Sequence, residues 1–210
     1  MTCVHRLALA AIMITWTTGV GATRAIPTLI QHSGPVELAI EMRNLAGVPP
    51  AVMRDTQAEV ERTFLAAGVR IIWVARDTPA ESPAALKLFI VGGTTTGVSR
   101  IESGATVVGL APPSGTWAQV FYRRVVAAVA DSQIAVSVVL AHVISHEIGH
   151  LLLPPNSHSA VGIMRQAVDL NHPALRRFTD EQSRRLRAAV MSGWRYAWPC
   201  DQSGATKGKE

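Results

Sequence analysis

The sequence predicts a single α+β domain whose strands and helices follow one another in an α/β-like order. Two observations predict this class. Pro and Gly divide the chain into short segments, several of which have strand composition, while two longer segments have the spacing or the apolar composition of helices. The 210 residues are 48% hydrophobic and 17% charged, which suits one sizeable core and excludes a disordered chain.

The first 25 residues have the pattern of a secretory signal peptide. Arg6 supplies the positive charge, residues 7–16 form an apolar run, and small residues precede the expected cleavage site. The run is shorter than the roughly 18 residues of a membrane-spanning helix, and no later segment resembles one. We therefore expect an exported protein, secreted or periplasmic, with no stable membrane span; an uncleaved anchor is the alternative.

Cleavage would leave one domain at 26–200 and a polar tail at 201–210 that we expect to be flexible. It would remove two arginines and no acid, lowering the formal net charge from +5 to +3. The remaining arginines lack interleaved aromatic residues, so we expect no nucleic-acid partner. Of the two cysteines only Cys200 would remain, which excludes an internal disulfide. Nothing in the sequence sets the oligomeric state.

The first half of the domain should contain four strands and one helix. Pro49-Pro50 begins the helix, which places Val60 and Phe64 on one face with Met53 and Ala67, and Gly68 ends it. The strands are expected at 36–45, 69–75, 86–91 and 106–111, with a Gly- and Thr-rich loop at 92–104.

The second half should be mainly helical. Residues 120–126 fit either a short strand or the start of a helix. The chain from about 132 to 153 is apolar on nearly all sides, which predicts a buried helix that Pro154-Pro155 must end. A capping box from Thr179 to Gln182 predicts a last helix, ahead of the apolar residues Leu186, Val190 and Met191.

The predicted buried helix carries the motif H-E-I-G-H at residues 146–150. His146 and His150 are one helical turn apart, so both imidazoles can reach one zinc ion. Glu147 can then act as a general base that takes a proton from water. Burying three such groups unpaired among Val and Leu would cost several kcal/mol, so the motif predicts a metal site.

A catalytic zinc site usually has three protein ligands. His158 is expected to be the third, because it follows the Pro-Pro break by three residues and the chain can turn back there. Asp169 and Glu181 are alternatives that would give two histidines and a carboxylate. His142, one turn before His146, is expected to be a core or supporting histidine.

The segment HEIGHLLLPPNSHS followed by GIM resembles the metzincin zinc peptidases, most closely their matrixin-like branch. The resemblance implies a zincin fold: a twisted mixed sheet, an active-site helix, a Met-turn and a C-terminal helix. It also implies that His146, His150 and His158 are the zinc ligands, that Glu147 is the general base, and that Met164 forms a hydrophobic floor beneath the metal.

The segment differs from the family pattern at two positions. His158 is eight residues after His150 where the family has six, and Leu153 stands where the family has glycine.

The expected strand at 106–111 resembles the family's edge strand, which would bind an extended peptide. Its expected substrate-facing residues are Val108, Gly109, Leu110 and Ala111.

These expectations lead to three functional hypotheses. The first is an exported zinc metalloendopeptidase acting on proteins or peptides. The second is a zinc hydrolase that cleaves non-protein amides or cell-wall peptides with the same residues. The third is a secreted binding protein that retains the zinc site without turnover; an intact Glu147 argues against it, since a structural site needs no general base.

Overall fold

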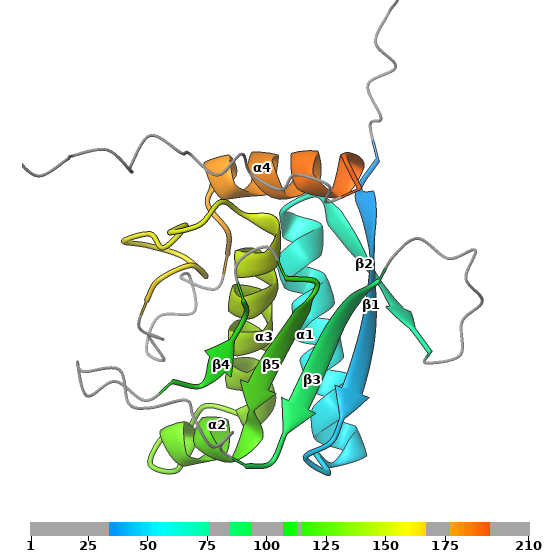
Figure 1. The fold of residues 1–210 in the computed structure, drawn as a ribbon. Helices are drawn as coiled ribbons and strands as arrows, with labels where there is room; N and C mark the ends of the chain where they lie inside the picture. The colour runs from blue at the N-terminus through cyan, green and yellow to red at the C-terminus, as the bar shows by residue number, and fades with distance from the viewer. Residues whose placement is uncertain (1–33, 76–84, 94–106, 113–114, 167–176, 194–210) are drawn as a thin grey trace, which may run out of the picture. The chain divides into compact units, whose positions relative to one another are not determined.

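The computed structural model describes residues 34–75, 85–93, 107–112, 115–166 and 177–193, all within one compact unit that begins at Ser33 (Figure 1). The predicted signal peptide, the predicted tail, Asp169 and Cys200 lie outside the described residues. Among the helices of the described part, none has both the length and the apolar character needed to cross a membrane.

A five-stranded sheet forms the centre of this unit. Its order is β2-β1-β3-β5-β4, with β4 antiparallel to β5 and every other pair parallel. β4 is therefore an edge strand. The strands are β1 (Val36–Asn44), β2 (Val69–Val74), β3 (Leu86–Val91), β4 (Gly109–Leu110) and β5 (Trp117–Phe121).

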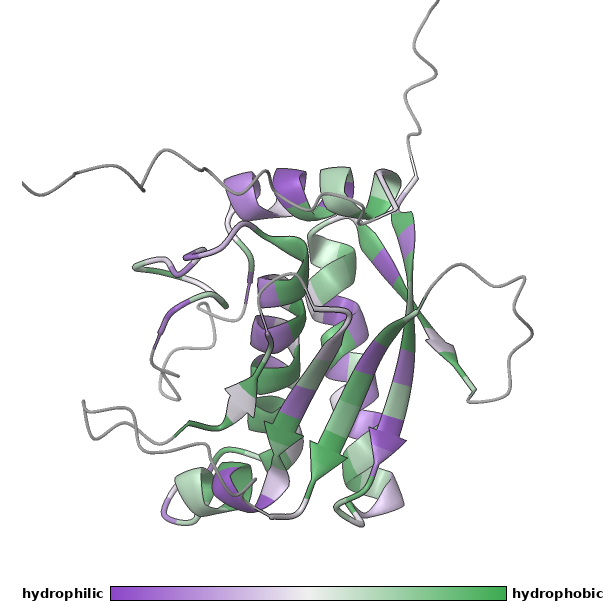
Figure 2. Cartoon of the chain, in the orientation of Figure 1, coloured by the Kyte–Doolittle hydropathy of each residue, from purple (hydrophilic) through white to green (hydrophobic). Residues whose placement is uncertain are grey.

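Four helices accompany the sheet. In Figure 1, α1 and α3 lie side by side behind it, and α4 crosses one end. Hydrophobic and hydrophilic residues alternate along β1, β3 and β5 (Figure 2), as expected of strands that bury one face. The helices are α1 (Pro50–Ala66), α2 (Tyr122–Val129), α3 (Val136–Leu152) and α4 (Asp180–Met191).

The described part has the mixed α and β composition that the sequence predicts, and several element boundaries are confirmed. α1 begins with Pro50, buries Val60 and Phe64, and ends before Gly68, whose φ of +79° favours glycine. α3 is buried on nearly all sides, as its composition predicts. Its first turn begins at Val136 rather than near residue 132.

The segment 120–126 contains both predicted alternatives, because β5 ends at Phe121 and α2 begins at Tyr122. The strand expected at 106–111 is shorter than predicted, since only Gly109 and Leu110 pair with β5. The sheet thus has five strands in the described residues, where the sequence predicted four and left 120–126 open.

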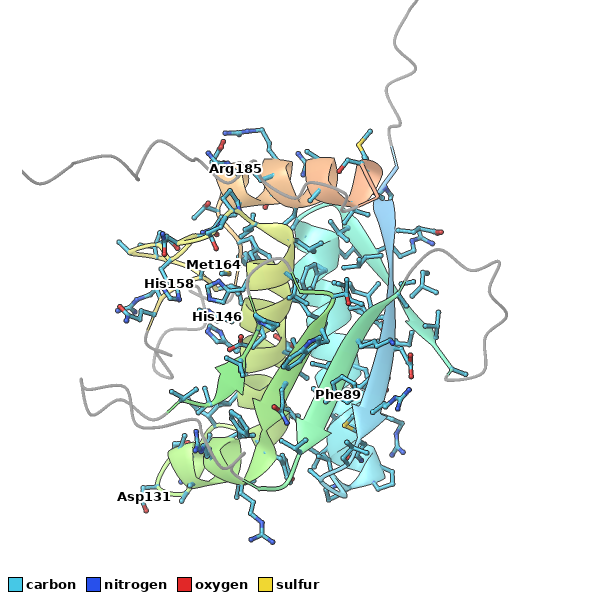
Figure 3. The ribbon with its side chains drawn as sticks, in the orientation of Figure 1. Phe89, Asp131, His146, His158, Met164 and Arg185 are labelled. Atoms are coloured by element: carbon cyan, nitrogen blue, oxygen red, sulfur yellow. The ribbon has the colours of Figure 1, made fainter. Side chains whose placement is uncertain are left out.

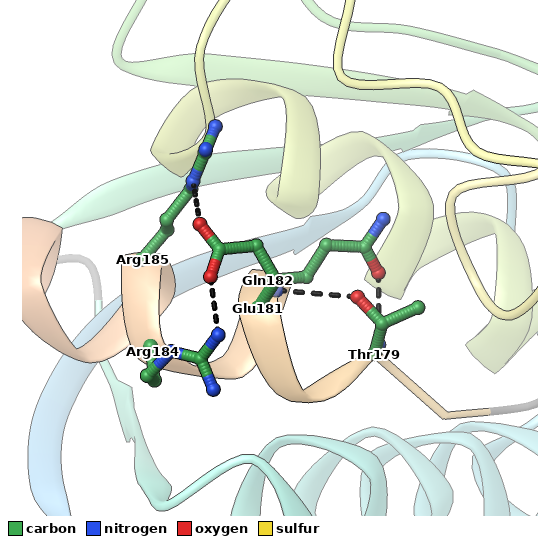
Figure 4. Close-up of polar contacts among 5 residues, drawn as sticks. All are labelled: Thr179, Glu181, Gln182, Arg184 and Arg185. Atoms are coloured by element: carbon green, nitrogen blue, oxygen red, sulfur yellow. Dashed lines mark hydrogen bonds and ion pairs between the residues drawn. The ribbon is translucent and has the colours of Figure 1, made fainter.

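The capping box of α4 is confirmed (Figure 4). Thr179 Oγ1 accepts from the Gln182 backbone N–H at 3.2 Å, and Gln182 Oε1 accepts from the Thr179 N–H at 2.9 Å. Leu186 is fully buried, whereas Met191 is 66% exposed. The helix therefore packs through a narrower apolar stripe than its composition suggests.

Candidate metal centre

Three imidazole groups converge beside the C-terminal half of α3. His146 and His150 project from consecutive turns, and their Nε2 atoms are 3.0 Å apart. His158 comes from the loop after the helix, with its Nε2 3.1 Å from that of His150. All three donor atoms lie within 4.8 Å of one another, close enough to bind one metal ion. Figure 3 shows His146 and His158 beside this helix.

The chain returns to the site after α3 through a turn that needs no glycine at position 153. Leu153 ends the helix in an extended conformation, and Pro154-Pro155 prevent its continuation. Asn156 then adopts a φ of +61°, a left-handed conformation that asparagine tolerates better than most residues. The sharp change of direction therefore occurs three residues after Leu153, and the longer spacing still brings His158 to the other two imidazoles.

A backbone carbonyl orients His146. Its Nδ1 lies 2.8 Å from the carbonyl oxygen of Ile163. Because a carbonyl can only accept, Nδ1 carries the proton and Nε2 presents its lone pair toward the other imidazoles. This arrangement is typical of histidine ligands, in which the second ring nitrogen is held by a hydrogen bond.

Met164 packs against the turn of α3 that carries the two histidines. Its side chain is fully buried. A Cβ atom at Gly149 would lie 2.5 Å from Met164 Sδ and 3.3 Å from the Phe178 ring. The glycine inside the H-E-I-G-H motif therefore allows the methionine to approach the helix backbone.

Glu147 is buried between α3 and the edge strand. It is 7% exposed, and burial raises the pKa of its carboxyl group to about 8. A Cβ atom at Gly109 in β4 would lie 2.3 Å from Glu147 Oε1 and 2.6 Å from its Cγ and Cδ. The absence of a side chain at position 109 thus leaves room for this carboxyl group. A cation bound by the neighbouring imidazoles would favour its ionised form.

The two helical histidines are held in the neutral form that binds metals. Burial lowers the pKa of His146, outweighing the raising effect of its hydrogen bond to Ile163. Burial, together with the charges of His146 and His158, lowers the pKa of His150 to about 4. Neutral imidazoles keep their Nε2 lone pairs available at neutral pH.

The edge strand directs some of its backbone groups to the side away from β5. Val108 accepts a hydrogen bond from the Phe121 N–H at 3.0 Å. Because hydrogen-bonded and non-hydrogen-bonded pairs alternate in antiparallel strands, Gly109 and Ala111 direct their N–H and C=O groups away from β5. Arg124 of α2 donates to the carbonyl of Val107 and so supports the start of this edge.

Of the two rival carboxylate ligands only Glu181 lies within the described residues, and it does not join the three histidines. Glu181 lies on α4 and pairs with Arg184 and Arg185 at 2.5 and 2.6 Å (Figure 4). These arginines lower the pKa of its carboxyl group. His142 is buried one turn before His146, outside the group whose donor atoms converge.

Comparison with known proteins adds no family to this description. None of the protein-family models searched matches the chain, and the search of curated proteins finds no matching sequence. The interpretation of the site therefore depends on its own residues. The sequence placed Gly109 on the expected edge strand and Gly149 inside the motif, but it did not predict that these glycines leave room for Glu147 and Met164.

Proposed function

We propose that the chain is an exported zinc-dependent metalloendopeptidase of the metzincin type. One observation carries the proposal: three imidazole nitrogens converge beside a buried carboxyl group that lies against the edge strand β4. The histidines would hold the metal, Glu147 would be the general base, and the edge strand would bind the substrate. Export is proposed from the N-terminal sequence pattern.

The donor set fits zinc. Nitrogen ligands about 2.0–2.1 Å from a tetrahedral centre lie about 3.3 Å apart, and two of the three Nε2 pairs are separated by 3.0 and 3.1 Å. Among the described residues the site has three imidazoles and neither a thiolate nor a fourth protein ligand, which is typical of catalytic sites that keep one coordination position open. Met164 supplies an apolar surface against the same helical turn.

Glu147 would move the proton in peptide hydrolysis. Zinc, when bound, would act as a Lewis acid that polarises the scissile carbonyl and increases the acidity of water. An Oε atom of Glu147 would accept the proton of the attacking water and later deliver it to the leaving amine. The burial of this carboxyl group excludes bulk water, which would otherwise weaken its interactions with the reacting atoms.

A peptide would lie along β4 as an added strand. The N–H and C=O groups of Gly109 and Ala111 that point away from β5 would form the main-chain hydrogen bonds with an extended chain. These bonds do not depend on the substrate side chains. They favour a protein or peptide substrate over a small non-protein amide, which has too little backbone to use them.

The test combines metal binding with hydrolysis. The purified protein is expected to bind one zinc ion, to lose that binding in His158→Ala, and to retain it in Glu181→Ala and Asp169→Ala. Glu147→Gln should bind zinc and fold normally while losing peptide hydrolysis.

Two results would overturn parts of the proposal. Zinc binding that survives in His158→Ala but fails in a carboxylate variant would indicate another zincin arrangement. A zinc-loaded protein that cleaves nothing in a broad peptide library would favour the secreted binding protein.

A further inference from the structure

The third histidine lies on a loop, unlike the other two. His146 and His150 are partly buried on a rigid helix, whereas His158 is exposed and follows the end of that helix by six residues. A loop ligand must be held in place by contacts outside the helix, because otherwise metal binding has to order it. The contacts of the next residue, Ser159, are therefore informative.

Ser159 joins the ligand loop to itself and to α4. Its backbone N–H donates to the Met164 carbonyl at 2.9 Å, which closes the loop. Its hydroxyl group donates to the Val161 carbonyl at 2.7 Å and accepts from Gln182 Nε2 at 3.1 Å. The backbone bond and both hydroxyl bonds therefore fix the residue next to His158.

Gln182 has a fixed orientation in this contact. It is 8% exposed, and its Oε1 accepts from the Thr179 N–H in the capping box of α4. Since the oxygen faces Thr179, the amide nitrogen must face Ser159. One side chain thus completes the cap of the last helix and holds the loop that carries the third histidine.

A second connection runs between the same two regions. Ile163 donates its N–H to the Arg177 carbonyl at 3.0 Å, just before α4. The carbonyl of the same Ile163 accepts from His146 Nδ1 at 2.8 Å. The start of α4 therefore supports one histidine through the backbone of Ile163 and a second through the Gln182 side chain.

We propose that Gln182 is a positioning residue that acts through Ser159 to hold His158 in place for metal binding. The proposal rests on the metal site of the proposed function. Its physical basis is that the Gln182–Ser159 contact orders the loop before the metal arrives, so that less of the binding free energy is spent on ordering. Removing either partner should weaken metal binding without changing the ligands.

Ser159→Ala and Gln182→Met each remove this contact and retain the approximate shape of the side chain. Each is expected to lower the zinc affinity by about tenfold, the lower end of the range for groups that support a ligand. The loss in the double variant should be smaller than the sum of the two single losses, because the two side chains share one contact. Cobalt-substituted protein should show the same loss of affinity and an altered visible absorption spectrum, which reports ligand geometry.

Thr179→Ala is the matched control. It removes the other half of the capping box and destabilises α4, but it leaves Gln182 and Ser159 in contact. Its zinc affinity and cobalt spectrum should equal those of the wild type. Equal losses in Thr179→Ala and Ser159→Ala would show that the effect is general destabilisation of α4 and would overturn the proposal.

The variant His158→Ala distinguishes a failure of the proposed metal site from a failure of the proposed role of Gln182. If His158→Ala loses zinc affinity and Ser159→Ala does not, the metal site stands and the positioning role of Gln182 is wrong. If His158→Ala binds zinc as well as the wild type, the proposed ligand set fails first, and the positioning role fails with it.

Discussion

Adding one methyl group at Gly109 should separate catalysis from metal binding. In Gly109→Ala the new Cβ would lie 2.3 Å from Glu147 Oε1, whereas ordinary van der Waals contact begins at 3.4 Å. The carboxyl oxygen must therefore retreat by about 1 Å. Rotation of the carboxyl group alone cannot relieve the clash, because Cγ and Cδ would both lie only 2.6 Å from the added atom.

A displacement of about 1 Å at a reacting group can cost about 100-fold in rate. We therefore expect Gly109→Ala to lower kcat/KM for a cleaved peptide by about 100-fold. The zinc stoichiometry and affinity should not change, because the three atoms nearest to the added methyl group all belong to Glu147 and none to a histidine. The assay is peptide hydrolysis by the zinc-loaded protein, together with a zinc titration.

Gly93→Ala is the matched control, since a Cβ there would have no atom of the described residues within 4 Å. It should leave both hydrolysis and zinc binding unchanged. Wild-type activity in Gly109→Ala would refute the assignment of Glu147 as a general base held against β4. A loss of zinc binding in Gly109→Ala would show that the added methyl group disturbs the ligands rather than the carboxyl group.

Three further predictions concern stability. Met164→Ala should lower the free energy of unfolding by about 2–5 kcal/mol, because the side chain is fully buried. The control Met191→Ala changes a side chain that is 66% exposed, and it should change the free energy of unfolding by less than about 0.5 kcal/mol. Equal losses of stability in urea unfolding of the two variants would contradict this prediction. Arg187 donates at 2.8 Å to a carbonyl at the end of α1, so Arg187→Ala should lower the free energy of unfolding by about 1.5–3 kcal/mol. Arg184→Ala breaks an exposed ion pair and should lower it by less than about 1 kcal/mol. In the metal-free protein the pKa of Glu147 is raised from 4.5 to about 8, so the folded state retains a proton that the unfolded chain releases. Stability relative to Glu147→Gln should therefore fall by about 1.4 kcal/mol per pH unit between pH 4.5 and 8; a difference independent of pH in a chelating buffer would contradict the buried carboxyl group.

Local patterns predicted much of the fold. The proline at the start of α1, Gly68 at its end and the Thr179–Gln182 capping box each act within a few residues, so the sequence shows them directly. The segment 120–126 stayed ambiguous because its apolar residues suit a strand and a helix equally, and only pairing with β3 decides where β5 ends. The order of the strands likewise depends on contacts between residues far apart in the chain.

The candidate site likewise combines features that follow from local patterns with features that depend on contacts between distant residues. Helical spacing brings His146 and His150 together, and the proline break allows His158 to follow. The placement of Glu147 against Gly109 joins residues 38 positions apart, and no local pattern reports it. A glycine inside a buried helix was an available signal at position 149, since glycine weakens a helix unless close packing requires it.

Two ligands lie on a helix and the third lies on a loop, and this difference affects how substitutions should change metal affinity. Two ligands and the carboxyl group come from one buried helix, so their relative positions are fixed when α3 packs against the sheet. The third ligand lies on the loop after this helix, which hydrogen bonds of Ser159 and of the Ile163 backbone hold in place. Changes in metal affinity without a change of ligand should therefore arise mainly from this loop and from the start of α4, while changes in turnover should arise from β4. The two properties are expected to respond to substitutions in different parts of the chain.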